Sequence, residues 1–135
     1  MTPEFLAAVL DSLLPGDEVL PSATRADLDP TAYVGSHRAA FVAIAAQAGG
    51  EEVFVAADEG ARTAALQAVQ QAAPAAFRTL LTSVLSDYYE AAPVLAALGW
   101  PSRPPQPTGH RVSPPDARTA ERLERVRNRG TLWRD

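Results

Sequence analysis

Residues 74–90, PAAFRTLLTSVLSDYYE, decide the fold class of this chain of 135 residues. Pro74 stands where a helix begins, because its fixed backbone angle suits the first helical turn. Large apolar side chains then recur at every third or fourth position, which is the spacing of one face of an α-helix. The pattern predicts a helix whose apolar face forms the centre of the core. The positions on that face are Phe77, Leu80, Leu81, Val84, Leu85 and Tyr88.

Three more helices are predicted before this stretch, and each has recognisable ends. Thr2 and Asp58 each precede a helix, and their side chains can cap its first amide groups. The pairs Pro15-Gly16 and Gly49-Gly50 follow helices as stop signals. The predicted ranges are 3–13, 31–48 and 60–72.

The segments between these helices are read from their composition. Residues 15–30 hold three prolines and four acids, and we expect an ordered connector that Leu20 anchors to the core. Residues 52–56, EVFVA, fit a short strand or a helix; we favour a helix or loop, because a single strand has no evident partner. Residues 93–98 predict a short helical turn that ends at Gly99.

The last third of the chain differs in composition from the rest. Six prolines lie from Pro101 to Pro115, and we expect an extended strap, because proline fixes the backbone angle and removes a donor. Asp116 is placed to cap a helix that runs to about Asn128 and is rich in arginine. The sequence therefore predicts an all-α fold. It consists of a small irregular bundle of about five helices (1–100), a proline-rich strap (101–115) and a C-terminal arginine-rich helix with its tail (116–135).

Charge is distributed unevenly along the chain. Residues 1–102 contain twelve acids and four arginines, a net charge of −8, whereas residues 103–135 contain eight arginines and four acids, a net charge of +4. A net acidic chain is poorly suited to nucleic acid, since phosphate attraction needs a dominant basic face. The basic tail is suited to an acidic patch, either on a partner or on its own body, and the sequence leaves both open.

No constellation of catalytic or metal-binding residues is evident. The chain has no cysteine, and its two histidines, His37 and His110, belong to no metal-ligand or nucleophile motif. We therefore predict no catalytic residue, no metal and no cofactor bound by this chain. No apolar run approaches the roughly 20 residues of a membrane span, and residues 1–4, MTPE, lack the features of an export signal, so we expect a cytoplasmic location.

Aromatic residues mark the best candidate for a binding surface. Tyr88 continues the buried stripe, so its neighbour Tyr89 must point elsewhere and lie at the surface near Trp100. Exposed aromatic and arginine side chains are typical of interface centres, although a strap that covers Tyr89 and Trp100 within the monomer is an equal alternative. The predicted partner-binding residues are Tyr89, Trp100, Pro101, Pro105, Gly109, His110, Arg111, Arg125, Arg129 and Trp133.

Three segments resemble a known family. Residues 14–23, LPGDEVLPSA, look like the N-terminal signature of the gluconate 2-dehydrogenase subunit 3 family. Tyr88-Tyr89, followed by PVL at 93–95 and LGWP at 98–101, resembles that family's tyrosine-to-Leu-Gly-Tyr-Pro segment. Residues 105–111, PQPTGHR, look like its Pro/Gly-rich tail. Each motif is short, and their combined order carries the resemblance.

The resemblance implies a helical small subunit without an active site. Its implied partner is the large subunit of an FAD-dependent sugar or polyol dehydrogenase of the glucose–methanol–choline type, and FAD is expected in that partner. The implied role is to stabilise the large subunit or help it mature. This chain departs from exported members of the family, since it has no twin-arginine signal and no cysteine.

Two other functions are weighed against this one. The first is a free-standing helical homo-oligomer or small-molecule-binding protein that uses the region of Tyr89 and Trp100 as its pocket. The second, and weaker, is an enzyme that uses His110 with Arg111 and a carboxylate.

Overall fold

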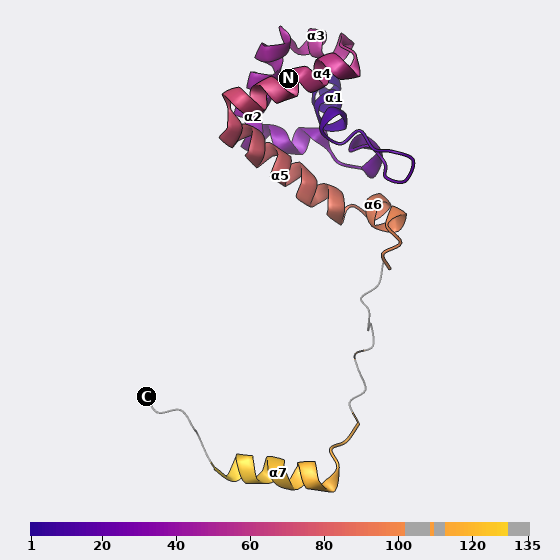
Figure 1. Ribbon diagram of the computed structural model, residues 1–135, viewed down its shortest axis with the longest axis vertical. Coiled ribbons are helices and arrows are strands. Elements are labelled where there is room, and N and C mark those ends of the chain that lie inside the picture. Colours follow the sequence, from indigo (N-terminus) through magenta and orange to yellow (C-terminus); the bar gives the residue numbers. More distant parts are fainter. Residues whose placement is uncertain (102–108, 110–112, 130–135) are drawn as a thin grey trace. The chain divides into compact units, whose positions relative to one another are not determined.

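The computed structural model describes residues 1–101, 109 and 113–129, and it divides into two units, Met1–Ser102 and Arg103–Asp135 (Figure 1). Within the described residues every regular element is helical and no strand occurs. The predicted all-α class is confirmed. None of the helices in this part of the chain has the length and apolar character needed to cross a membrane.

Unit 1 contains six α-helices and two single 3-10 turns among its described residues. Two of the predicted caps are formed here: the Thr2 hydroxyl accepts a hydrogen bond from the Phe5 amide at 3.3 Å, and the Asp58 carboxylate accepts one from the Ala61 amide at 2.7 Å. The elements are α1 (Pro3–Leu13), η1 (Thr24–Ala26), η2 (Pro30–Tyr33), α2 (Val34–Ala48), α3 (Glu51–Ala56), α4 (Glu59–Ala72), α5 (Pro74–Glu90) and α6 (Ala92–Ala97).

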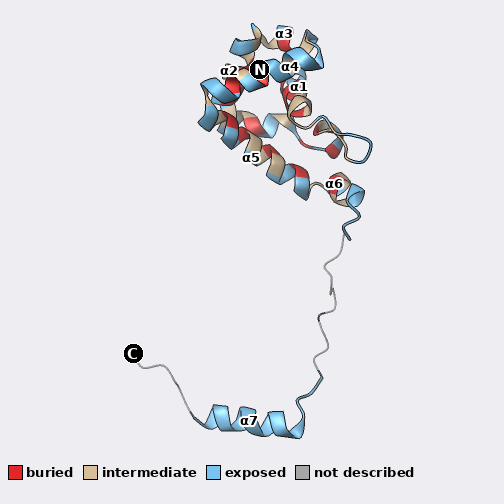
Figure 2. Ribbon diagram, viewed as in Figure 1, coloured by how far each residue is buried: buried red, intermediate tan, exposed pale blue. Residues whose placement is uncertain are grey.

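The core of unit 1 is built around α2 and α5. Helix α2 packs against α3, α4 and α5, and α1 packs against α3. The Phe5 ring meets those of Phe41 and Phe54 edge-on, with centroid distances of 6.4 and 5.6 Å, so one aromatic cluster joins α1, α2 and α3. The predicted stripe of α5 faces inward: Phe77, Leu80, Val84 and Tyr88 are buried, and Leu81 and Leu85 are half-buried (Figure 2).

The segment that fitted either a strand or a helix is a helix, α3. Gly50 precedes it with a φ of 136°, a backbone conformation that glycine adopts readily, and this turns the chain away from the end of α2. Phe54 is fully buried, because α3 places it against Phe5 and the rest of the core. A short amphipathic helix satisfies its own backbone groups, which a lone strand cannot do.

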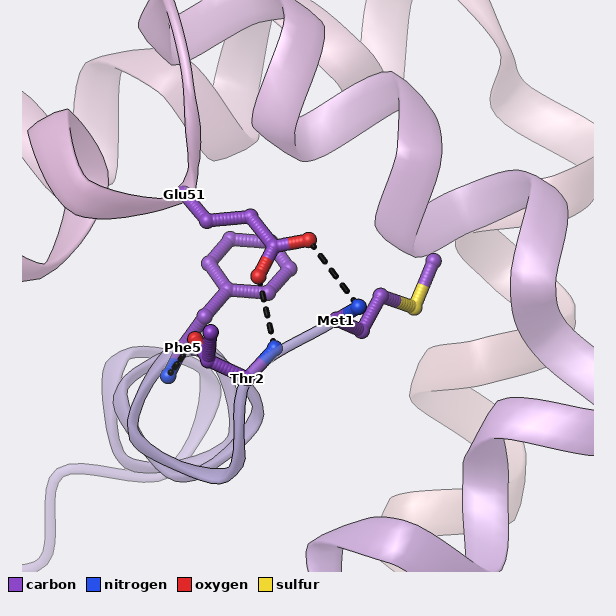
Figure 3. Close-up of polar contacts among 4 residues, drawn as sticks. All are labelled: Met1, Thr2, Phe5 and Glu51. Atoms are coloured by element: carbon purple, nitrogen blue, oxygen red, sulfur yellow. Dashed lines mark hydrogen bonds and ion pairs between the residues drawn. The ribbon is translucent and has the colours of Figure 1, made fainter.

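The first helical turns of α1 and α3 are tied together by Glu51 (Figure 3). Its carboxylate accepts a hydrogen bond from the Thr2 amide at 2.6 Å and pairs with the Met1 ammonium group at 3.3 Å. The backbone hydrogen bond from Thr2 is the main reason why the pKa of Glu51 lies below its usual value.

The predicted helix 31–48 differs from the structure at its start. It begins as the 3-10 turn η2, capped by Asp29, whose carboxylate accepts from the Thr31 amide at 2.9 Å. Inside α2 the backbone leaves helical geometry at His37 (φ −121°, ψ 21°). Gly35 and Ser36 lie just before this kink, and a glycine–serine pair is a common cause of such a break.

Unit 2 contains α7 (Ala117–Asn128) among its described residues. The predicted cap is confirmed, because the Asp116 carboxylate accepts from the Thr119 amide at 2.7 Å. No residue of α7 is buried. The predicted strap, 101–115, falls mostly outside the described residues.

Candidate functional site

The loop of residues 14–23 is held closed by its own polar groups. Asp17 accepts hydrogen bonds at 2.7 Å from the amides of Val19 and Leu20, and its own amide donates to the Leu20 carbonyl at 2.9 Å. These amide bonds, led by that of Leu20, lower the pKa of the Asp17 carboxyl. Half-buried Leu20 packs against the core as predicted. The loop therefore has a defined conformation.

Gly16 makes this loop shape accessible. Its φ is 75°, which side chains other than glycine rarely adopt. A Cβ atom placed on Gly16 would stand 2.5 Å from the Ser22 amide nitrogen and 2.7 Å from the Leu20 carbonyl oxygen. The turn at Pro15-Gly16 thus requires glycine for two reasons, backbone angle and close approach.

A single hydrogen bond joins this loop to the end of α5. The Tyr88 hydroxyl donates to the Pro21 carbonyl at 2.7 Å, across 67 positions in the sequence. Tyr88 is only 3% exposed, whereas Tyr89 is 51% exposed, which confirms the predicted division between the two tyrosines. We refer to residues 14–23 and 88–101 together as the α5–α6 surface.

Trp100 is presented by the end of α6. Gly99 has a φ of 71°; its amide donates to the Ala96 carbonyl at 3.0 Å, and the Trp100 amide donates to the Leu95 carbonyl at 2.9 Å. This pair of bonds is a frequent helix stop that needs glycine in the left-handed conformation. The Trp100 side chain is 67% exposed and Leu98 is 45% exposed. The backbone therefore holds a large aromatic side chain in solvent.

Two hollows in unit 1 share Pro93 in their walls. One, of about 500 Å³, is formed by the loop 15–22 with Arg25 and Pro93, and it includes Val19, which is 66% exposed. The other, of about 410 Å³, is lined by residues 26–29, Tyr33 and the junction of α5 and α6. The α5–α6 surface is thus concave on both sides of the point where α6 begins.

The second hollow is bordered by carboxylates that the sequence did not single out. Asp27, Asp29, Asp87 and Glu90 lie along its wall. The Tyr33 hydroxyl donates to Asp87 at 2.6 Å, and burial, then this bond, raise the pKa of Tyr33. Tyr33 and Asp87 are 54 positions apart, so the pattern of residues along either segment could not predict that the two segments lie together.

The other predicted site residues are placed as follows. Pro101 is exposed, and so is Gly109, with a φ of 74°. Arg125 and Arg129 are exposed on and just after α7, and Arg125 pairs with Glu121 at 3.3 Å. Four predicted residues lie outside the described ranges: Pro105, His110, Arg111 and Trp133. The strap that was weighed as a cover for Tyr89 and Trp100 lies there as well.

His37 is half-buried beside the Tyr33 ring, with a centroid distance of 6.3 Å, which is a packing position. Within residues 1–101, 109 and 113–129, no three His, Asp or Glu side chains are grouped as a metal site requires. Unit 1 exposes Tyr89 and Trp100 and has two hollows that share Pro93, and neither aromatic residue lines them.

Comparison of the chain with protein-family models, with curated proteins and with solved structures finds no match.

Proposed function

We propose that this chain is an accessory subunit that binds a larger protein through the α5–α6 surface. The observation that carries the proposal is the hydrogen bond from Tyr88 to Pro21. It joins the two segments, 14–23 and 88–101, whose sequences resemble the gluconate 2-dehydrogenase subunit 3 family. Two motifs that are distant in sequence and adjacent in space are what a shared binding surface requires.

The physical character of the surface supports a protein partner. Tryptophan and tyrosine dominate the energetics of protein interfaces, because each buries a large area at small entropic cost. Here Tyr89 and Trp100 are exposed on a backbone that is already ordered. A preordered surface loses little freedom on binding, so more of the contact energy is realised as affinity.

The proposed partner is the large subunit of an FAD-dependent sugar or polyol dehydrogenase of the glucose–methanol–choline type. In this proposal the large subunit holds FAD and performs the oxidation, and the present chain supplies no reacting group. Its role is to stabilise the large subunit or to assist flavin loading. Binding that selects the folded large subunit raises its stability by mass action.

The test is co-expression with candidate large subunits, beginning with any flavin-dependent dehydrogenase encoded beside this chain. We expect a complex that survives size-exclusion chromatography, and a higher ratio of flavin to polypeptide than the large subunit reaches alone. Replacing Tyr89 and Trp100 together by alanine is expected to weaken the complex about 30-fold or more. Val42→Ala is the matched control, since Val42 is an apolar side chain on α2 that is 52% exposed.

Two results would contradict the proposal. One is a large subunit that is equally soluble and equally loaded with flavin in the absence of this chain. The other is a purified chain that self-associates in sedimentation velocity runs and becomes monomeric when Trp100 is replaced. The second result would assign the α5–α6 surface to a homo-oligomer instead.

A further inference from the structure

Four arginines of unit 2 fall on one line along α7. Arg118, Arg122, Arg125 and Arg129 are spaced i, i+4, i+7 and i+11, and residues at this spacing share one face of an α-helix. The stripe extends for about 16 Å along the helix axis, at 1.5 Å per residue. We call these four residues the arginine stripe. Arg127 does not belong to it, because its position is on the opposite side of the helix.

An apolar strip runs beside the arginine stripe. Val126 borders the stripe, and Leu123 lies between Val126 and Arg127, its neighbour at i+4; they are 55% and 54% exposed. The acids of α7, Glu121 and Glu124, lie away from this strip. The apolar strip is therefore flanked by arginine on both sides, and the acids occupy the remaining side of the helix.

The arginine stripe is largely without carboxylate partners in the described residues. The one ion pair on α7 joins Arg125 to Glu121 at 3.3 Å, with side chains 67% and 70% exposed. An exposed pair of this kind contributes little to stability. The guanidinium groups of Arg118, Arg122 and Arg129 are exposed as well. Helix α7 thus exposes arginine and apolar side chains that make few contacts within the helix.

We propose that α7 is a docking helix that binds a groove in an acidic protein, with Leu123 and Val126 in the groove and the arginine stripe along a carboxylate-lined rim. Amphipathic helices commonly bind in this manner. Arginine suits such a rim, because its planar guanidinium pairs with a carboxylate through two parallel hydrogen bonds. The inference rests on the proposed function only in taking the partner to be a protein, and it does not require a flavoprotein.

Charge argues for a protein groove over a nucleic acid or a lipid surface. The net charge of −8 over residues 1–102 repels acidic proteins and polyanions alike, so the choice of partner rests on α7 itself. Within α7, Glu121 and Glu124 oppose a phosphate backbone but are compatible with a groove that contacts one face only. The apolar strip consists of two aliphatic side chains without an aromatic residue, which is little for insertion into a bilayer.

The test measures binding of the full chain to three probes at about 0.15 M salt, where long-range attraction is screened. The first probe is a synthetic amphipathic helix of about 20 residues, with glutamates on one face beside a leucine strip. The others are a DNA duplex of about 20 base pairs and vesicles that contain phosphatidylserine. We expect saturable binding of the acidic peptide and at least tenfold weaker binding, about 1.4 kcal/mol, to the other two.

Two charge reversals at exposed arginines, one in α7 and one in unit 1, provide the matched comparison. Arg122→Glu lies in the arginine stripe and is expected to weaken peptide binding about tenfold or more. Arg78→Glu makes the same change at an exposed arginine of α5 in unit 1 and should weaken it less than threefold. Leu123→Ser is a second variant that leaves the charge intact and should also weaken binding. Far-UV circular dichroism of each variant verifies that the helix is retained.

Three outcomes overturn the inference: no saturable peptide binding, equal losses for Arg122→Glu and Arg78→Glu, or tighter binding of DNA or vesicles than of the peptide. None of them involves a dehydrogenase. Failure of this inference is therefore distinguishable from failure of the proposed function, which is tested on the α5–α6 surface.

Discussion

Helices α5 and α7 are both amphipathic, yet among the described residues only α5 has a buried apolar face. In α5, Phe77, Leu80, Val84 and Tyr88 are buried against the rest of unit 1. In α7, Leu123 and Val126 are more than half exposed and no residue is buried. Periodicity specifies a helix and one of its faces, but stability depends on what packs against that face. The predictions below test this difference, from the largest expected effect to the smallest.

Replacing a leucine of the apolar face by alanine in each helix should have very different effects on stability. Leu80→Ala in α5 removes a fully buried side chain and is expected to lower the free energy of unfolding by about 2–5 kcal/mol. Leu123→Ala in α7 should change it by less than about 0.5 kcal/mol, because that side chain is exposed. Urea denaturation of both variants is the measurement. Equal losses would show that α7 belongs to the cooperative core and would remove the contrast.

Gly16→Ala tests whether the loop of the α5–α6 surface shares the rigidity of α5. The new methyl group would collide with the backbone of Ser22, and the φ of 75° at position 16 is unfavourable for alanine. We therefore expect the free energy of unfolding to fall by about 2 kcal/mol. Gly49→Ala is the control: its φ of 86° strains an alanine in the same way, but nothing lies within 4 Å of an added Cβ, so we expect a smaller loss of about 1 kcal/mol. Thermal unfolding monitored by circular dichroism compares the two. A neutral Gly16→Ala would mean that the loop is free to rearrange.

Tyr88→Phe removes the hydroxyl that joins the two halves of the α5–α6 surface. The Pro21 carbonyl would lose its partner, at a cost of about 1 kcal/mol. Tyr89→Phe should have almost no effect on unfolding, because Tyr89 is exposed. Chemical denaturation of this pair of variants separates the buried tyrosine from the exposed one. Identical stabilities of the two variants would argue against the hydrogen bond.

The smallest expected effect comes from Tyr33, and it depends on pH. Burial and the bond to Asp87 raise the pKa of Tyr33 in the folded state. Tyr33 therefore loses its proton at a lower pH in the unfolded chain than in the folded chain. Its contribution to stability is full below pH 10 and is lost as the pH rises above that value. The chain has no lysine, so tyrosines dominate this range. Tyr33→Phe should cost at most about 1 kcal/mol near neutral pH, because Asp87 is exposed to water.

The measurement for Tyr33 is the free energy of unfolding from pH 8 to 11 in both proteins. We expect the unsubstituted chain to lose stability more steeply above pH 10 than Tyr33→Phe does, so that the two curves converge. Parallel curves across this range would show that Tyr33 titrates alike in the folded and unfolded states.

Local sequence patterns were sufficient for most of the helices and several of their ends. The caps at Thr2, Asp58 and Asp116, the stop at Gly49-Gly50 and the buried stripe of α5 are all formed as predicted. The reason is that a cap or a helical face depends on residues within a few positions of one another. The division between Tyr88 and Tyr89 follows from the same rule, because adjacent helical residues cannot share a face.

Only the tertiary structure decided the features that depend on distant residues. The helical state of residues 51–56 follows from Phe54 packing against Phe5, and the kink at His37 interrupts a segment whose composition predicted one helix. The bonds from Tyr88 to Pro21 and from Tyr33 to Asp87 join residues 67 and 54 positions apart. Spacing along a chain cannot reveal such pairs, since they form only when packed helices bring the two segments together. For this reason the sequence alone identified Trp100 and the arginines of α7, whereas the joined loop and the carboxylate-lined hollow beside α6 became visible only in the folded chain.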